Sequence, residues 1–219
     1  MHLSTSEENY LKCIAYLSGA ENETVSTNSI AAQMKTTAAS TTDMLRKLSD
    51  KKLLNYKKYM GVSLTREGVK CAHMLIRKHR MWEVFLLEKL GFKWDEVHEI
   101  AEQLDHIQSE ELITRLEQFL NFPKYDPHGD PIPDRFGKME NKNEMLLAEL
   151  QIGSIAHVSG VKDTSNKFLQ HLSKLNIGLG STIEIKDINE YDQSYEVLVN
   201  NKTLIHVSHQ VSRNIYVSQ

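Results

Sequence analysis

Two stretches in the middle of the sequence carry histidine and acidic side chains at helical spacing. The six residues are His79, Glu83, His98, Glu102, Asp105 and His106. Side chains three and four positions apart lie on one face of an α-helix, so two facing helices could bring three imidazoles and three carboxylates together. Nitrogen and hard oxygen donors without a thiolate suit a divalent metal ion. The same spacing also occurs in solvated pairs on helix surfaces, and spacing alone leaves both interpretations open.

The same residues match no common catalytic motif. Residues 98–102 have the pattern HExxE and not the HExxH of zinc proteases, and Glu102 and His106 are one residue too far apart for the E-x-x-H of di-iron bundles. The sequence contains no GxSxG, no GxxxxGK[ST] and no GxGxxG after a strand. We therefore expect a protein that is not an enzyme and binds no nucleotide.

Charge is distributed unevenly along the 219 residues. The formal net charge of the chain is −3, but residues 1–72 contain ten Lys/Arg and seven Asp/Glu, which gives +3 there and leaves −6 for the remainder. A positive first third and an acidic remainder suit a phosphate-contacting module joined to a cation-binding one.

The cysteines and the apolar stretches of the sequence indicate the cellular compartment in which the protein is expected. Cys13 and Cys71 are far apart and form no CxxC pair, which argues against a disulfide scaffold or a cysteine zinc finger and suits a reducing environment. The first residues lack the basic start and apolar run of a signal peptide. No stretch approaches the roughly 20 apolar residues that span a membrane. We expect a cytoplasmic protein.

Residues 1–72 have the pattern of a winged helix-turn-helix. Apolar spacing predicts a helix through residues 10–17, a short helix after Ser26-Thr27, and a further helix through residues 39–48. Two short strands with a turn at Met60-Gly61 follow. This order predicts a DNA-binding domain, although a small helical domain with a solvated basic hairpin would have the same pattern.

The last helix of this motif would enter the major groove, and the hairpin would contact the phosphate backbone. We expect the helix to expose its hydroxyl and charged side chains on one polar face. The candidate DNA-binding residues are Thr37, Ala39, Ser40, Thr41, Thr42, Asp43, Arg46, Lys47, Lys57, Lys58 and Tyr59.

Residues 73–140 are predicted to form a helical domain. A long helix begins after Thr65 and ends at Gly91, a second begins at Trp94-Asp95, and a third follows Ser109. These helices are more apolar than three short helices can bury alone, so we expect a symmetric homodimer to cover the surplus. The polar residues 134–143 are predicted to be a flexible linker.

Residues 145–219 are predicted to form a small SH3-like β-barrel. Several short strands and one helix, over residues 166–175, are predicted here. Asn200-Asn201 has the composition of a hairpin turn. The predicted fold class is therefore mainly α with a small β part. Its three expected domains are a winged helix-turn-helix (1–72), a helical metal-binding and dimerisation domain (73–140) and an SH3-like domain (145–219).

Several runs of residues resemble the diphtheria toxin repressor and manganese transport regulator family. They are Arg77-Lys78-His79-Arg80-Met81-Trp82-Glu83, His98-Glu99 with Ala101-Glu102 and Asp105-His106, Pro123-Lys124 with Pro127-His128-Gly129 and Ile132-Pro133, Glu8-Asn9-Tyr10-Leu11-Lys12, and Gly61-Val62-Ser63-Leu64-Thr65. Residues 175–183 resemble the FeoA-type SH3-like domain of that family. The resemblance covers nearly the whole chain in the family's order. It implies a dimeric repressor that binds operator DNA upstream of metal-transport genes when a metal co-repressor is bound.

The resemblance also implies metal ligands. A primary site would comprise Glu102, Asp105 and His106 with Asn9 or Glu8 from the first helix. A second site would comprise His79, Glu83 and His98. Manganese-type members with an SH3-like domain further use the positions of Asp126, His128 and Asp163, and Asp126 stands where such relatives often have Cys.

Sites without Cys or Met favour Mn(II) or Fe(II) by ligand type, whereas Zn(II) can substitute in vitro because its intrinsic affinity is higher. Glu102 stands where iron-sensing relatives have Cys, which favours Mn(II). Metal would tie the first helix to the metal-bearing helices and favour the DNA-binding arrangement.

Three alternatives stay open. The first is an Fe(II)-dependent repressor of the same family. The second is a metal-binding redox or storage protein, for which the basic winged helix would have no use. The third is a winged-helix regulator that senses a small molecule, in which the histidines and acids only face solvent.

Overall fold

The computed structural model describes residues 3–19, 21–57, 60–140 and 145–218. The chain divides into two compact units. Unit 1 comprises Met1–His79, Leu104–Thr114 and Ile132–Glu140, and unit 2 comprises Arg80–Gln103, Arg115–Pro131 and Asn141–Gln219. Within the described part of the chain, no helix combines the length and apolar character needed to span a lipid bilayer.

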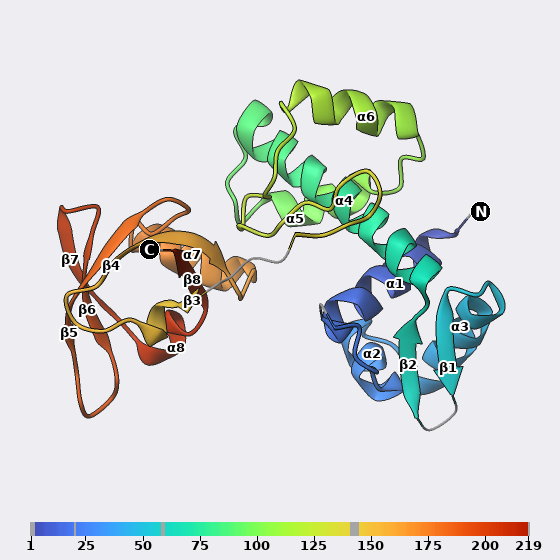
Figure 1. The fold of residues 1–219 in the computed structure, drawn as a ribbon, viewed down its shortest axis with the longest axis horizontal. Helices are drawn as coiled ribbons and strands as arrows, with labels where there is room; N and C mark the ends of the chain where they lie inside the picture. Colours follow the sequence, from blue (N-terminus) through green and yellow to red (C-terminus); the bar gives the residue numbers. More distant parts are fainter. Residues whose placement is uncertain (1–2, 20, 58–59, 141–144, 219) are drawn as a thin grey trace. The chain divides into compact units, whose positions relative to one another are not determined.

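Unit 1 starts with three helices (Figure 1), and each of them begins at a side-chain cap. α1 (Thr5–Ser18) follows Ser4, α2 (Thr27–Gln33) follows Ser26, and α3 (Ala38–Asp50) follows Thr37. Each cap hydroxyl accepts a hydrogen bond from a backbone N–H of the first turn, which would otherwise have no partner. The apolar faces form one core with the fully buried residues Leu11, Ile14, Ile30, Leu45 and Leu48. The predicted order of helices is confirmed.

A two-stranded hairpin follows α3. β1 (Leu54–Lys57) pairs antiparallel with β2 (Gly61–Leu64), as Figure 1 shows beside α3. Gly61 has φ 89°, and a Cβ there would lie 2.6 Å from the carbonyl oxygen of Val25, so this position requires glycine. Lys57 is exposed, whereas the predicted DNA contacts Lys58 and Tyr59 lie outside the described residues.

Three further helices follow, and the first two of them carry four of the candidate metal ligands, His79, Glu83, His98 and Glu102. They are α4 (Arg66–Leu90), α5 (Val97–Leu104) and α6 (Glu110–Phe119). Thr65 accepts from the backbone N–H of Gly68 at the start of α4, and Ser109 accepts from that of Leu112 at the start of α6, as the sequence predicts. The predicted start of α5 at Trp94 is wrong, because residues 94–96 form a turn and the helix begins at Val97.

The segment predicted to be a flexible linker is folded over part of its length. Asp134 accepts two backbone hydrogen bonds from its own turn. The carbonyl oxygen of Pro133 accepts from Arg77 at 2.7 Å, and that of Gly137 lies 2.7 Å from Nδ1 of His73. The linker prediction is therefore wrong for residues 134–138. Their polarity reflects a turn capped by an aspartate and anchored on α4. Residues 141–143 lie outside the described residues.

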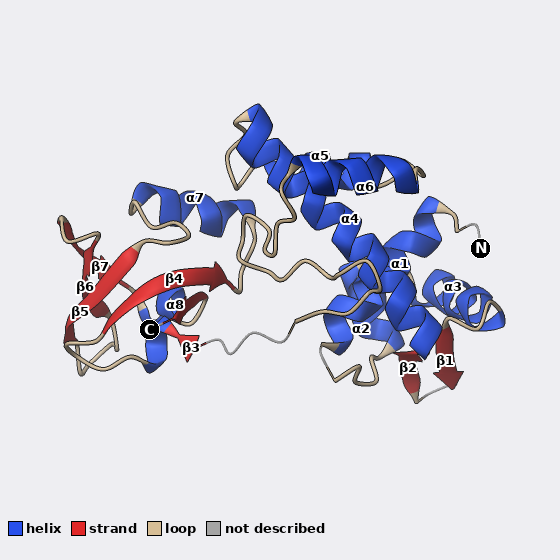
Figure 2. Cartoon of the chain, turned by 45° about the horizontal axis from the view of Figure 1, so that its top comes forward, coloured by secondary structure: helices blue, strands red, loops and turns tan. Residues whose placement is uncertain are grey.

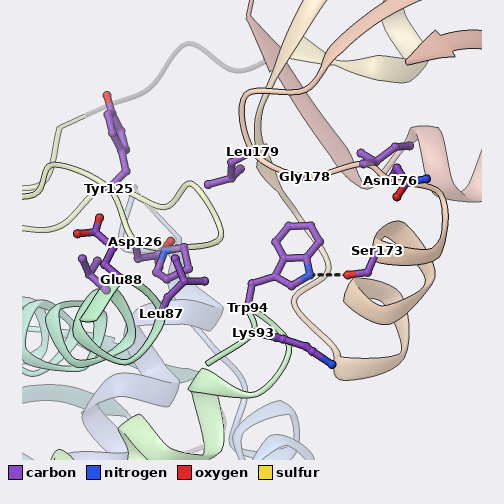
Figure 3. Close-up of a pocket in the computed structure, with 13 residues that line it drawn as sticks. Leu87, Glu88, Lys93, Trp94, Tyr125, Asp126, Ser173, Asn176, Gly178 and Leu179 are labelled. Carbon is purple, nitrogen blue, oxygen red and sulfur yellow. Dashed lines mark hydrogen bonds between the residues drawn. The ribbon is translucent and has the colours of Figure 1, made fainter. Parts of the chain in front are cut away.

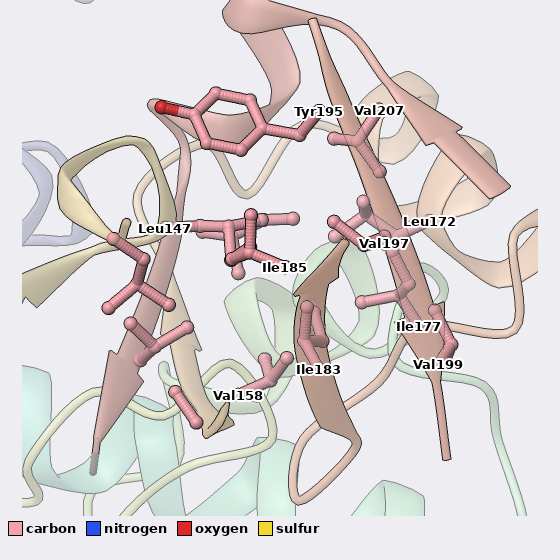
Figure 4. Close-up of a cluster of buried hydrophobic side chains, with 14 of the residues drawn as sticks. Leu147, Val158, Leu172, Ile177, Ile183, Ile185, Tyr195, Val197, Val199 and Val207 are labelled. Atoms are coloured by element: carbon pink, nitrogen blue, oxygen red, sulfur yellow. The ribbon is translucent and has the colours of Figure 1, made fainter. Parts of the chain in front are cut away.

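Unit 2 contains an antiparallel sheet with the strand order β3-β8-β4-β5-β6-β7 (red in Figure 2). The strands are β3 (Met145–Leu146), β4 (Ile155–Val161), β5 (Thr182–Ile188), β6 (Tyr195–Val199), β7 (Thr203–Val207) and β8 (Ile215–Ser218). Alternate side chains of β6 are buried, and α7 (Asn166–Lys174) adds Leu169 and Leu172 to the same core. Figure 4 shows Leu172 beside the β6 residues Val197 and Val199. The predicted barrel of short strands is confirmed.

Three short elements of unit 2 were not predicted from the sequence. They are β3, the 3₁₀-helix η1 (Leu147–Glu149) and α8 (His209–Ser212). Two to four residues are too few to produce a hydrophobic period. The hairpin turn was predicted correctly, since Asn200 and Asn201 adopt φ values of 51° and 55° between β6 and β7.

Candidate metal centre

Three buried side chains of unit 2 bring potential metal ligands together. Glu83 comes from α4, and Asp126 and His128 come from the loop after α6. One ligand atom from each lies within 4.8 Å of the others, and all three residues are buried. We call these three residues the Asp126 centre. It combines two carboxylates and one imidazole, which is a hard donor set.

The loop of the Asp126 centre is held in place by its own hydrogen bonds and by an arginine. Oδ1 of Asp126 accepts from the backbone N–H groups of His128 and Asp130, at 2.8 and 2.9 Å. Arg80, one turn before Glu83 on α4, lies 3.4 Å from Oδ2 of Asp126 and 2.8 Å from Oδ2 of Asp130. Arg80 is part of the family-like run, but sequence reasoning gave it no role.

The ring of His128 has a defined tautomer. Its Nε2 lies 2.9 Å from the carbonyl oxygen of Trp94, and because a carbonyl can only accept, Nε2 carries the proton. In the neutral ring Nδ1 then has the lone pair, and it lies 3.9 Å from Oε2 of Glu83. A histidine that donates one N–H to a backbone carbonyl and presents its other nitrogen to carboxylates has the arrangement of a metal ligand.

Negative charge accumulates at the Asp126 centre. Burial, together with the neighbouring carboxylates of Glu83 and Asp130, raises the pKa of Asp126 to about 7, against the opposing effect of Arg80 and His128. A buried carboxylate beside another carboxylate is costly to ionise unless a cation is present. The residues of the Asp126 centre thus fit a divalent cation by donor type, tautomer and charge.

A glycine next to His128 allows a close approach of two backbones. Gly129 has φ 91°, and a Cβ there would lie 2.2 Å from the carbonyl oxygen of Ser159. We expect Gly129→Ala to lower the Tm by about 3–10 °C through strain and displacement, and to weaken metal binding by the adjacent centre. Differential scanning calorimetry and metal titration measure both.

Gly153→Ala is the matched control. Gly153 also has a positive φ, 84°, but a Cβ there meets no atom within 4 Å. The control should therefore show only the strain of a positive φ, with metal binding unchanged. Equal changes in Tm and in metal affinity for the two variants would show that the contact between Gly129 and the Ser159 carbonyl has no special effect.

Two further predicted ligands of unit 2 lie at the edge of the Asp126 centre or beyond it. Nδ1 of His98, on α5, donates to Oε1 of Glu83 at 3.2 Å, although the His98 side chain is 53% exposed. Asp163 is half-buried and accepts from the backbone N–H of Ser165 at 2.8 Å. In the described chain Asp163 does not belong to the group around Asp126.

Unit 1 brings together a second set of predicted ligands. Oδ2 of Asp105 accepts from Nδ1 of His79 at 3.0 Å and from Nζ of Lys12 at 2.6 Å, and all three residues are buried. Nδ1 of His106 lies 3.7 Å from Oε2 of Glu8 on α1. Burial by itself would raise the pKa of Asp105, but His79 and Lys12 together hold it below its usual value. We call these five residues the Asp105 cluster.

Two side-chain oxygen atoms, one of Asp105 itself and one of the residue after Glu8, are buried and accept no hydrogen bond in the described chain. Oδ1 of Asn9 and Oδ1 of Asp105 have no hydrogen-bond partner among the described residues. Glu102 is half-buried on α5, three positions before Asp105. Sequence reasoning missed Lys12, although its position three residues after Asn9 places the two on one face of α1.

α3 exposes most of the predicted DNA contacts. The exposed residues are Thr37, Ala39, Ser40, Asp43, Arg46 and Lys47, and Thr42 is half-buried. The prediction that Thr41 is exposed is wrong: its exposed fraction is 0%, and its hydroxyl lies 3.4 Å from that of Tyr10. Thr41 lies four positions before Leu45 and shares the core-facing side of α3 with it.

A pocket of about 610 Å³ in unit 2 reaches the Asp126 centre. Asp126 lines it together with residues of α4 and of the segment after α7. Figure 3 shows the indole of Trp94 at this pocket, donating to the hydroxyl of Ser173 at 2.9 Å. Asp126 therefore connects the buried centre with the space of the pocket.

Family models match three consecutive parts of the chain. Residues 2–62 match the N-terminal DNA-binding domain of iron-dependent repressors, and residues 65–134 match the metal-binding and dimerisation domain of iron-dependent repressors. Residues 145–219 match the FeoA domain.

Solved structures similar to this chain cover nearly its whole length. A manganese-dependent transcriptional repressor in complex with manganese is 29% identical, with a TM-score of 0.85 over 96% of this chain and 98% of that one. ScaR with bound Cd²⁺ is 32% identical, with a TM-score of 0.79 over 97% of this chain and 99% of that one.

Curated relatives match over a shorter part of their own length. The iron-dependent repressor IdeR of Mycobacterium tuberculosis is 31% identical over 60% of this chain and 50% of IdeR. A probable metal transport system membrane protein of Chlamydia trachomatis is 44% identical over 36% of this chain and 17% of that protein. The chain thus spans half or less of the length of these two relatives.

Proposed function

This chain belongs to the iron-dependent repressor family, which includes the diphtheria toxin and manganese-dependent repressors, and we propose that it represses metal-uptake genes when a divalent metal ion is bound. The observation that carries the proposal is His128, whose Nε2–H is fixed by the Trp94 carbonyl so that Nδ1 faces Glu83. We assign the resident ion to Glu83, Asp126 and His128, with His98 at their edge.

The ion that we propose is Mn(II). Two carboxylates and an imidazole, with no thiolate, suit Mn(II) or Fe(II) by ligand type, and Zn(II) should substitute in vitro because its intrinsic affinity is higher. Structural relatives are described with bound manganese, Cd²⁺ and Zn²⁺. Fe(II) is the second candidate, since relatives such as IdeR are iron-dependent repressors.

The chain's own residues prepare this centre. A bound cation would supply two positive charges that balance Glu83 and Asp126. Arg80 and the backbone N–H groups of the loop orient Asp126, and Trp94 orients His128. Because the ligands come from α4 and from a loop, an ion bound to all of them would stabilise the arrangement in which the two segments lie together. Metal binding then favours one conformation of the chain, as a co-repressor requires.

DNA is the proposed partner of α3 and the hairpin. α3 presents Ser40, Arg46 and Lys47 at the surface, and Lys57 is exposed on β1. We assign base contacts to the first turns of α3 and phosphate contacts to the hairpin. The three-domain division at residues 1–72, 73–140 and 145–219 belongs to this proposal, as does action in the cytoplasm.

A homodimer is the proposed active form. Large apolar side chains are exposed in both units, among them Leu90, Leu112, Phe119 and Phe122. Exposed apolar groups of this size in a helical domain indicate a surface that a second copy covers. Two DNA-binding domains per dimer would then read two half-sites of an operator.

The test is a gel shift on the promoter of the chain's own gene and on promoters of metal transporters. We expect a shift in the presence of Mn(II) or Fe(II) and none, or a much weaker one, in chelator. Equally strong binding in chelator would show that metal is no co-repressor. Metal binding without any DNA binding would favour a storage or redox protein.

A further inference from the structure

The Asp105 cluster contains a cation that belongs to the protein. Nζ of Lys12 lies 2.6 Å from Oδ2 of Asp105, and the two side chains are only 6% and 4% exposed. Sequence resemblance places Asp105 in a metal site, yet this carboxylate already has an ammonium group in contact. A protonated lysine has three N–H donors and no lone pair, so it cannot serve as a metal ligand in that state.

A divalent ion and the Lys12 ammonium would compete for the same carboxylate. Like charges repel strongly when both are buried, because the surroundings screen them little. The residues of the Asp105 cluster therefore do not fit a metal ion as they stand. The Asp126 centre differs, because Asp126 interacts there with the carboxylates of Glu83 and Asp130, the nearby cation Arg80 lies 3.4 Å from it, and no lysine is part of the group.

We propose that the Lys12 ammonium takes the cation position of the Asp105 cluster, so that α1 is joined to Asp105 without metal and the cluster binds no ion in the wild-type chain. This rests on the proposed function only in assigning the resident ion to the Asp126 centre. Removing the ammonium would leave Oδ2 of Asp105 with its contact to His79 but without the Lys12 cation. Oδ1 of Asp105 is already buried without a hydrogen-bond partner in the described chain, so we expect a new metal site at this carboxylate.

The experiment counts bound ions. Full-length protein is freed of metal with chelator, equilibrated with Mn(II) by dialysis and analysed by mass spectrometry for Mn per protomer. We expect about one ion for the wild type, about two for Lys12→Gln and about none for Glu83→Gln. Lys12→Met is a second variant that removes the charge without adding an amide.

Lys51→Gln is the matched control. Nζ of Lys51, the residue after α3, lies 2.7 Å from Oε1 of Glu7, so this ion pair also holds a buried carboxylate of α1. This variant should gain no ion, although it loses an ion pair of the same helix.

Thermal unfolding gives a second measurement. Without metal, Lys12→Gln should have a Tm about 5–10 °C below the wild type, since Asp105 loses its cation. The rise in Tm on addition of Mn(II) should be larger for Lys12→Gln than for Lys51→Gln.

The deciding quantity is the gain of one ion on removal of Lys12. No gain in either Lys12 variant overturns the inference, even where the wild type binds one ion. A wild type that binds none, with one ion gained by Lys12→Gln, supports the inference while contradicting the Asp126 centre. If the metal-free variants are unfolded, refolding by Mn(II) with one more ion bound per protomer than in the wild type supports it, and refolding without that extra ion, or failure to refold, overturns it.

Discussion

The His128→Ala variant should lose the rise in DNA affinity that Mn(II) gives the wild-type chain. Couplings of this kind amount to about 5–150-fold in affinity, and we expect the variant to bind operator DNA weakly whether or not Mn(II) is present. The reason is geometric. Among the described residues, His128 provides the imidazole of the group with Glu83 and Asp126, and the contact of its Nε2 with the Trp94 carbonyl orients the ring.

Fluorescence anisotropy with a labelled operator, in Mn(II) and in chelator, measures this loss. Bound Mn per protomer should fall in the same variant. His157→Ala is the control, since His157 is an exposed histidine of the same unit and its ring contacts the hydroxyl of Thr182 at 3.2 Å. A full response to Mn(II) in His128→Ala would show that the co-repressor binds elsewhere.

The sequence was sufficient to predict the elements that position the candidate sites. Long apolar periods, caps such as Thr65 and Ser109, and the Asn200-Asn201 turn are local features, and local features determine where helices and hairpins begin and end. The boundary of α5 was misplaced because a turn at residues 94–96 precedes the helix. That turn also directs the Trp94 carbonyl toward His128, a role that no periodicity could indicate.

The contents of the two candidate sites could be predicted only in part. Spacing along one helix predicts that Glu102 and Asp105 share a face, but it gives no information about side chains on another helix. Lys12 reaches Asp105 across 93 positions of sequence. Arg80 likewise reaches the loop at Asp126 from 46 positions away. Such contacts depend on tertiary packing, so the sequence identified the ligand types but not the cations that already compensate them.

Thr41 illustrates the same limit within one helix. Threonine is polar, and a polar residue between Ser40 and Thr42 was assigned to the exposed face. The helical period places it with Leu45 instead, and its hydroxyl is accommodated beside that of Tyr10. The polar residue type predicts an exposed Thr41, whereas its position in the helical repeat predicts a buried one. The position in the repeat determines the outcome, because α3 buries only one face.

The second large effect that we expect is a loss of DNA affinity when an exposed side chain of α3 is removed. Arg46→Ala should lower operator affinity by about 5–150-fold, the equivalent of roughly 1–3 kcal/mol for a base contact. Arg46 is 59% exposed, and its contact with Asp43 at 3.6 Å joins two exposed side chains, so that ion pair holds it only weakly. Lys57→Ala should lower the affinity for operator and unrelated DNA by the same factor. It should also reduce the dependence of affinity on salt concentration by the equivalent of about one phosphate contact.

Anisotropy titrations at several salt concentrations, with operator and unrelated DNA, distinguish these two roles. Thr41→Val should keep the sequence preference and lose only a little stability, about 0.5–1.5 kcal/mol for one hydrogen bond, because Thr41 faces Tyr10. Lys167→Ala, at an exposed position of α7, controls for the loss of one positive charge. Wild-type affinity in Arg46→Ala and Lys57→Ala would exclude α3 and the hairpin as the DNA interface. A changed sequence preference in Thr41→Val would mean that α3 binds DNA in a conformation other than the one described.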